Sequence, residues 1–198
     1  MEASHMLRRR EVVRALLEDR RDLLVIAGLG APAWDVTAAG DHPRNLPLWG
    51  GRGSAAMIGL GLALAQPNTP VLVVTGDGEM LMGLGALATI AVKRPLNLSV
   101  VVLDNEHYGE TGMQRTHTAY AVDLAAIARA AGFPRASVVR SEDDLAVVRA
   151  SVHEFAGPLF AQVKVVAEAL PLVLPPREGA LLQARMRESV LGPEAHLA

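Results

Sequence analysis

Two short apolar runs, each followed at once by glycine, acidic or amide residues, constrain this chain most strongly. Residues 71–75 lead into Gly-Asp-Gly, and residues 98–103 lead into Asp104 and Asn105. Runs that are apolar almost throughout are typical of parallel strands covered by helices on both faces. Ligands of such sheets bind beyond the carboxyl ends of the strands. The sequence therefore predicts a ligand site where these two runs end.

Other β-rich runs alternate with helical stretches along the chain, which predicts an α/β fold. We expect a doubly wound parallel sheet of about six strands with helices on both faces. The expected strands are residues 23–28, 45–50 (the weakest), 71–76, 98–104, 136–141 and 159–166. The expected helices lie near residues 7–20, 53–66, 80–93, 123–131 and 142–155.

The pattern changes at both ends of the chain. Residues 1–6, MEASHM, are typical of a cloning remnant, and we leave them out of the fold. Residues 7–166 form the predicted domain. Residues 167–198 read as an arm, with an extended LPLVLPP segment and then a short amphipathic helix. Such an arm either packs on a partner subunit or straps its own domain.

Composition excludes several classes of protein. A chain of 198 residues with a net charge of −2 suits one domain and offers no basic footprint for nucleic acid. No apolar run reaches the roughly 20 residues of a membrane span, and no signal peptide opens the chain, so we expect a cytoplasmic protein without a membrane partner. The absence of cysteine excludes disulfides and thiolate-bound zinc or iron–sulfur clusters.

Asp77 and Asn105 are the candidate ligand-binding side chains. Asn105 comes one helix and one strand after Asp77, so both should reach the same edge of the sheet. A carboxylate, an amide oxygen and a main-chain carbonyl, completed by diphosphate oxygens, would suit Mg²⁺. The adjacent glycines allow close backbone approach, and free N–H groups favour an anion. Taken alone, Gly-Asp-Gly is equally compatible with a tight turn capped by its Asp.

Together these features resemble the thiamine diphosphate motif, in which Gly-Asp-Gly is followed by a pair ending in Asn. GGRGSAAMIGLGLALAQPNTPVLVVTGDG, residues 50–78, is similar to the glycine-rich loop, helix and strand of 2-oxoacid decarboxylases. The resemblance covers roughly residues 20–166 and fits only the diphosphate-binding domain. DNEHYGETGMQRT, residues 104–116, is most similar to the sulfopyruvate and phosphonopyruvate decarboxylases, which carry Asn-Asn and then Gly-x-Gln-x-Thr.

The resemblance implies a role for each matching residue. The metal would be held by the side chains of Asp77 and Asn105 and the carbonyl of His107. The cofactor diphosphate would face Gly78, Glu79 and Tyr108, mostly through backbone N–H groups. The rings of thiamine diphosphate would lie against the glycine-rich loop, at Gly50, Gly51, Arg52 and Gly53. Candidates for lining the reactive carbon, and so for catalysis, are His107, Glu110 and His117.

Four departures from the family pattern stand out. Asp104 replaces the usual first Asn of the pair, at a position that need not touch the metal. Glu79 stands where a small or hydroxyl residue is commoner, so its charge must point away from the diphosphate. Arg52 stands where a bulky apolar residue normally shapes the cofactor, although its aliphatic stem could fill that space. Residues 28–35, GLGAPAWD, lack the Thr, Ser and Arg-Glu side chains of similar proteins.

The resemblance also implies what surrounds this domain. Thiamine enzymes need a pyrimidine-binding domain with an activating Glu, and no room remains for one here. We therefore expect the β-type subunit of a split enzyme, α₂β₂ or larger, that decarboxylates a small anionic 2-oxo acid to an aldehyde. Arg52, Arg115 and His117 are the candidates for binding a sulfonate or phosphonate head. A carboligase subunit, an oxidoreductase subunit and a degenerate, non-catalytic cofactor-binding scaffold remain alternatives.

Two unrelated readings are weaker. GLGAPA after a strand mimics a dinucleotide-binding fingerprint, which would need an acidic residue about 20 positions later, and residues 46–54 contain none. Gly-Asp-Gly also occurs in phosphatases with an aspartyl nucleophile, but no Asp-x-Asp follows the first strand.

Overall fold

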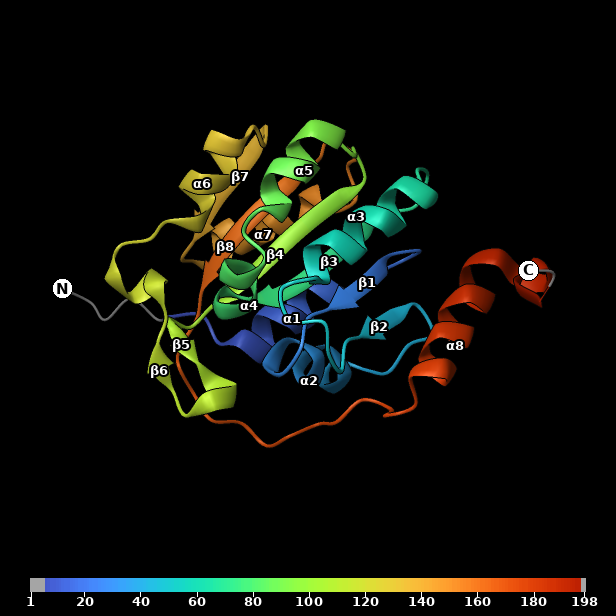
Figure 1. The fold of residues 1–198 in the computed structure, drawn as a ribbon, viewed down its shortest axis with the longest axis horizontal. Helices are drawn as coiled ribbons and strands as arrows, with labels where there is room; N and C mark the ends of the chain where they lie inside the picture. The colour runs from blue at the N-terminus through green and yellow to red at the C-terminus, as the bar shows by residue number, and fades with distance from the viewer. Residues whose placement is uncertain (1–5, 197–198) are drawn as a thin grey trace.

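A six-stranded parallel sheet forms the centre of the protein, as the sequence predicts (Figure 1). The structure is a computed structural model that describes residues 6–196, so most of the expected cloning remnant lies outside the described residues. The strand order is β2-β1-β3-β4-β8-β7. The strands are β1 (Leu24–Ala27), β2 (Asn45–Pro47), β3 (Val71–Gly76), β4 (Leu98–Asp104), β7 (Arg135–Val139) and β8 (Leu159–Lys164).

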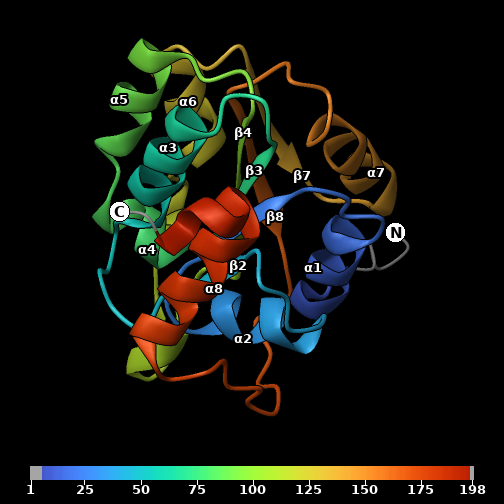
Figure 2. The same ribbon diagram turned by 90° about the vertical axis from the view of Figure 1, so that its right-hand side faces the viewer.

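Helices cover both faces of this sheet (Figure 2). The helices are α1 (Arg9–Leu17), α2 (Ala31–Ala38), α3 (Ala55–Ala65), α4 (Asp77–Met82), α5 (Ala86–Lys93), α6 (Leu124–Ala131), α7 (Glu142–Ser151) and α8 (Gly179–Leu191). Side chains of α3, α5 and α6 share one core with Val73, while those of α1, α2 and α7 share the other core with Leu72 and Val74. Because successive residues of β3 enter opposite cores, the strand is apolar along its whole length.

The helix expected at residues 80–93 is instead two helices, α4 and α5. They are separated by a turn that begins at Gly83. A Cβ atom on Gly83 would lie 1.9 Å from the carbonyl oxygen of Gly53, so only glycine permits this approach of backbone to backbone. The break therefore depends on a contact with a segment far away in the sequence, which helical periodicity does not reveal.

Two further elements were not expected. Helix α2 occupies most of the GLGAPAWD segment, where its N-cap Gly30 offers no capping side chain. A small antiparallel hairpin pairs β5 (His107–Tyr108) with β6 (Gln114–Arg115). Two short 3₁₀ helices, at Gly109–Thr111 and His117–Tyr120, belong to the same region.

The C-terminal arm packs on the domain of its own chain, and α8 lies against the edge strand β2 (Figures 1 and 2). Arg185 of α8 binds both carboxylate oxygens of Asp41, at 2.8 and 2.9 Å. The indole N–H of Trp49 donates to the carbonyl of Pro176 at 2.8 Å. Nowhere in residues 6–196 is there a helix long and apolar enough to cross a membrane.

Candidate active site

A cavity opens at the carboxyl edge of the sheet, where β1, β3, β4 and β8 end. It lies beside the topological switch point of the sheet, between β1 and β3, where the strand order reverses. Ligands of open parallel sheets usually bind at such a point. Its volume of about 120 Å³ is smaller than the roughly 300–1,000 Å³ of complete ligand pockets. This chain therefore encloses only part of a large ligand. The residues that line it after the strand ends include Leu29, Pro32, Asp77, Gly78, Asn105 and Val165.

Asp77 is the buried acid of this cavity and the first residue of α4. One of its carboxylate oxygens accepts a hydrogen bond from Thr116 at 2.5 Å, and the Thr118 hydroxyl lies 3.2 Å from the same oxygen. Burial raises the pKa of Asp77 to about 6; the Thr116 bond opposes this rise and the charge of Asp104 adds to it. Within residues 6–196, no Lys or Arg pairs with Asp77. A bound divalent cation would offset the cost of this buried charge, so the site fits one.

Asn105 and His107 leave β4 through a sharp turn at Glu106, whose φ is 62°. The Asn105 amide oxygen accepts the His107 backbone N–H at 3.0 Å, and the His107 Nδ1 lies 2.8 Å from the Asn105 carbonyl oxygen. Both residues line the same cavity as Asp77, so the three predicted magnesium ligands lie together. In the described part of the chain, no cluster of three His, Asp or Glu side chains suits a metal. The predicted set is of another kind, with a single carboxylate.

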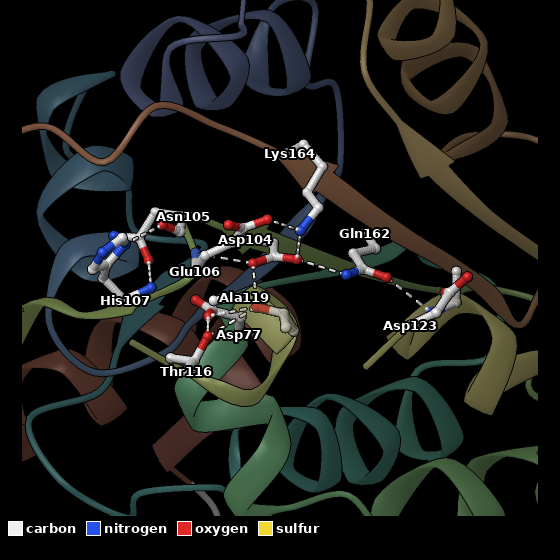
Figure 3. Close-up of polar contacts among 12 residues, drawn as sticks. Asp77, Asp104, Asn105, Glu106, His107, Thr116, Ala119, Asp123, Gln162 and Lys164 are labelled. Atoms are coloured by element: carbon white, nitrogen blue, oxygen red, sulfur yellow. Dashed lines mark hydrogen bonds and ion pairs between the residues drawn. The ribbon is translucent and has the colours of Figure 1, made fainter. Parts of the chain in front are cut away.

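Buried polar side chains connect Asp77 to the end of β8 (Figure 3). Besides contacting Asp77, the Thr118 hydroxyl donates to Asp104 at 2.7 Å. The ammonium group of Lys164 lies 2.8 Å from Asp104 and 2.6 Å from Glu106. Burial lowers the pKa of Lys164, but hydrogen bonds from its ammonium to the two carboxylates outweigh burial and raise that pKa.

This network explains how a charged residue, Asp104, can stand in place of the first Asn of the family's Asn-Asn pair. Asp104 is 1% exposed and does not line the cavity. Its charge is paired with Lys164, and the Gln162 side chain donates to the same carboxylate at 2.6 Å. Asp104 therefore supports the edge of the sheet from behind instead of facing the ligand.

The glycine-rich loop, residues 50–54, lies mostly outside this cavity. Gly50, Gly51 and Gly53 do not line it in this chain, whereas Arg52 does. Gly51 and Gly53 have φ angles of 67° and 82°, and Gly50 and Gly51 are exposed. On the other wall, a Cβ atom on Gly78 would lie 2.6 Å from the ring of Tyr108, so a larger residue there would displace that ring.

Glu79 also lines the cavity, but its carboxylate is held toward β1 and the glycine-rich loop. The Thr75 hydroxyl donates to Oε2 at 2.7 Å, and a Cβ atom on Gly28 would lie 1.8 Å from that oxygen. Burial raises the pKa of Glu79, while the Thr75 bond and the backbone N–H groups of Ala55 and Gly53 oppose the rise. Its other oxygen is buried and has no hydrogen-bond partner in the described residues.

The candidate catalytic residues divide into two groups. His107 and Glu110 line the cavity, and the Glu110 carboxyl group lies close to Gly30 at the start of α2. His117 is exposed and does not line it. Arg115, a candidate for binding the substrate head, is also outside, because its guanidinium stacks 4.8 Å from the centre of the Tyr120 ring.

Sequence reasoning missed four residues at or behind the cavity. Thr116 and Thr118 hold Asp77, Lys164 neutralises Asp104, and Arg9 lines the cavity from the start of α1. Polar residues interrupt the otherwise apolar β8, and this interruption was the sequence signal that could have identified Lys164. Arg9 belongs to a run of three arginines and has no such sign.

Comparison with known proteins places this arrangement in one family. Residues 38–163 match the C-terminal TPP-binding domain of thiamine pyrophosphate enzymes. The chain is 42% identical over 160 residues to sulfopyruvate decarboxylase subunit beta of Methanothermobacter thermautotrophicus, covering 81% of this chain and 83% of that one. It is 38% identical over 186 residues to phosphonopyruvate decarboxylase of Streptomyces viridochromogenes, covering 93% of this chain.

Solved structures agree on the fold. Benzoylformate decarboxylase from Polynucleobacter necessarius matches with a TM-score of 0.68 at 22% identity, over 87% of this chain. The present chain spans 35% of that enzyme and 46% of the phosphonopyruvate decarboxylase, so it corresponds to one part of those longer proteins. With the family model matched over most of the domain, the chain belongs to the thiamine pyrophosphate enzymes and carries their C-terminal cofactor-binding domain.

Proposed function

We propose that this chain is the diphosphate-binding subunit of a heteromeric enzyme that decarboxylates a small 2-oxo acid to an aldehyde, using thiamine diphosphate and Mg²⁺. The observation that carries the proposal is that Asp77, Asn105 and His107 all line the same cavity. The likeness to a sulfopyruvate decarboxylase subunit, which covers most of both chains, supports it.

The residues of the cavity suit the metal and the cofactor. Asp77 and Asn105 would bind Mg²⁺ through side-chain oxygens, and His107 through its carbonyl. Backbone N–H groups at Gly78, with Tyr108 beside them, would receive the diphosphate. When bound, thiamine diphosphate supplies the electron sink for carbanion chemistry, while the protein binds and orients the reactants.

Proton handling near the reacting carbon falls to His107 and Glu110 in this proposal. Both line the cavity, whereas His117 would contribute only if assembly brought it there. A general acid or base must come within hydrogen-bond reach of the proton it moves. Replacement of His107 by Asn and of Glu110 by Gln should therefore lower kcat in the assembled enzyme more than it weakens cofactor binding.

A partner subunit fits the shape of the site. The cavity encloses only part of a large ligand, and the glycine-rich loop beside it is exposed. We propose that a pyrimidine-binding, α-type subunit covers this side and supplies the activating Glu, in an α₂β₂ or larger assembly. The word "subunit" in the name of the Methanothermobacter relative supports this assembly.

For the substrate, we propose a three-carbon 2-oxo acid with a sulfonate or phosphonate head, with Arg52 as one group that binds this head. An arginine fork suits such oxygens. Arg52→Leu should raise KM for sulfopyruvate by roughly tenfold to a hundredfold, the cost of one charge-assisted contact. The KM for pyruvate should change little. Equal changes for both substrates would instead make Arg52 a residue that shapes the cofactor.

Co-purification of the native complex tests the function. The complex should release CO₂ and aldehyde from sulfopyruvate or phosphonopyruvate, and only with both subunits, Mg²⁺ and thiamine diphosphate present. Efficient decarboxylation by this chain alone would contradict the split enzyme. Formation of a ligated product, or reduction of an electron acceptor, would assign the chain to a carboligase or an oxidoreductase. Cofactor binding without any turnover would indicate a non-catalytic scaffold.

A further inference from the structure

Arg9 is a buried cation that nothing above assigns to the ligand. It is the first residue of α1, is 6% exposed and lines the cavity. Its Nη1 lies 2.5 Å from Oδ2 of Asp35 in α2, and Asp35 is the only hydrogen-bond partner of its side chain within residues 6–196. A guanidinium has five N–H donors. Most of the donors of Arg9 are thus without a partner in the described chain.

The charges around Arg9 do not cancel. Asp35 is buried and also accepts a hydrogen bond from Nε of Arg10 at 3.1 Å. Two arginines share one carboxylate, which leaves a net positive charge. Arg10 is more exposed, binds the carbonyl of Pro171 at 2.8 Å and does not line the cavity. The unbalanced charge therefore reaches the cavity through Arg9.

The other groups on the cavity wall are compatible with an anion near Arg9. Ala31 and Pro32, the first residues of α2, line the wall, and the N-cap Gly30 has no capping side chain. Pro32 has no N–H and the Ala33 N–H donates to the Gly28 carbonyl at 3.1 Å, so this helix end contributes few free donors. The positive end of a helix favours negative charge. Three acids share the wall with Arg52. Asp77 is the proposed metal ligand, and Glu79 accepts a hydrogen bond from Thr75. The Glu110 carboxyl group lies close to Gly30, so an anion is expected beside the Arg9 guanidinium and not at the start of α2.

We propose that Arg9 binds a tetrahedral oxyanion, that is, a phosphate, phosphonate or sulfonate group, in the part of the cavity beside its guanidinium. Asp35 holds the guanidinium in place, and the free donors form charge-assisted hydrogen bonds with the anion. Two sources carry this chemistry: the terminal phosphate of the cofactor and the head of the substrate. Their identity rests on the proposed function, whereas the oxyanion site rests on Arg9 and its surroundings.

The test compares Arg9→Met with its matched control Arg10→Met, which loses a contact to the same Asp35 but lies off the cavity. Because removal of one partner leaves Asp35 buried and charged, a double variant, Arg9→Met with Asp35→Asn, removes both charges. Circular dichroism checks that each variant is folded. Calorimetry in Mg²⁺ buffer then measures binding of inorganic pyrophosphate and of sulfopyruvate, first to the chain and then to its complex with the partner.

Both Arg9 variants should bind one of these probes roughly tenfold more weakly or worse, which is the cost of a lost charged contact. The Arg10 control should bind both as the wild type does. Loss confined to pyrophosphate assigns Arg9 to the cofactor, and loss confined to sulfopyruvate assigns it to the substrate. Unchanged binding of both probes, or equal losses in the Arg10 control, would overturn the site. Neither measurement needs turnover, so a complex without decarboxylase activity would count against the proposed function only.

Discussion

The two sides of the cavity are built differently. Asp77, Asn105 and His107, here called the metal rim after the magnesium site proposed there, are held by hydrogen bonds from their own chain, and Asp77 is 2% exposed. The glycine-rich loop, residues 50–54, is largely exposed at Gly50, Gly51 and Arg52, where its hydrogen bonds are local, such as Ser54 N–H to Gly51 carbonyl at 2.9 Å, and it is anchored at Gly53 against Gly83. Hydrogen bonds within the chain thus position the side that fits a metal, whereas Gly50, Gly51 and Arg52 on the side proposed to face the reactive ring are exposed. This difference is what the proposed division between two subunits would require.

The metal rim should respond most strongly to mutation. Asp77→Asn keeps an oxygen that can accept the Thr116 hydrogen bond but removes the negative charge. Because Mg²⁺ needs a hard anionic ligand, magnesium-dependent binding of thiamine diphosphate should weaken by about a hundredfold or more, roughly 3 kcal/mol. Isothermal calorimetry with and without Mg²⁺ measures this loss.

The matched control is Glu188→Gln, which removes an exposed carboxylate of α8 and should leave binding unchanged. Wild-type affinity in a folded Asp77→Asn protein would show that Asp77 is not a metal ligand.

The support behind the rim should matter next. Lys164→Met leaves Asp104 buried without its cation, and breaking a buried pair costs about 3 kcal/mol of unfolding free energy or more. A double variant, Lys164→Met with Asp104→Asn, removes both charges and should recover much of this loss. Urea unfolding of the two variants and of the exposed control Lys93→Met gives the values. A cost as small as that of Lys93→Met would mean that the pair does not stabilise the edge.

The raised pKa of Asp77 predicts a pH dependence in magnesium-free buffer. Between its ordinary value near pH 4 and its folded value of about 6, the folded chain binds more protons than the unfolded chain at this site. The contribution of Asp77 to stability is therefore most favourable at low pH and declines as the pH rises through 6, by up to about 3 kcal/mol.

Unfolding free energies of the wild type minus those of Asp77→Asn, measured from pH 4 to pH 7, isolate this contribution from that of other groups. Added Mg²⁺ should reduce the decline. A difference that stays flat across this range would show that the carboxyl group of Asp77 is not perturbed.

The sequence predicted what depends on local pattern. All six strands of the main sheet were located, because β1, β3, β4 and β8 are largely apolar runs and the edge strands β2 and β7 follow the alternation of strands and helices. The approach of Asp77 to Asn105 followed from the rule that neighbouring parallel strands end at one edge. Helix α2 was missed because GLGAPAWD begins without a polar cap. The break between α4 and α5 was missed because it depends on contact with Gly53.

The unpredicted part of the site consists of residues that act on others from distant segments. Thr116 and Thr118 reach Asp77 only because the hairpin folds back over α4, and Lys164 reaches Asp104 from the neighbouring strand. Arg9 enters the cavity from a helix that precedes the first strand. Thr116 ends the Gly-x-Gln-x-Thr pattern, but that pattern does not say which side chain Thr116 contacts. Each of these pairs depends on packing between elements.

The smallest change in unfolding free energy is expected for a substitution at Trp49, the residue that precedes the glycine-rich loop. Trp49 is 41% exposed and donates one hydrogen bond, to the carbonyl of Pro176 in the C-terminal arm. Trp49→Phe removes this bond but keeps an aromatic ring, and a partly exposed hydrogen bond contributes about 1 kcal/mol or less. Urea unfolding should therefore show a loss of that size, with little change in magnesium-dependent cofactor binding to the isolated chain. A loss as large as that of Lys164→Met would mean that the loop is held as firmly as the residues that support the metal rim, and the contrast between the two sides would fail.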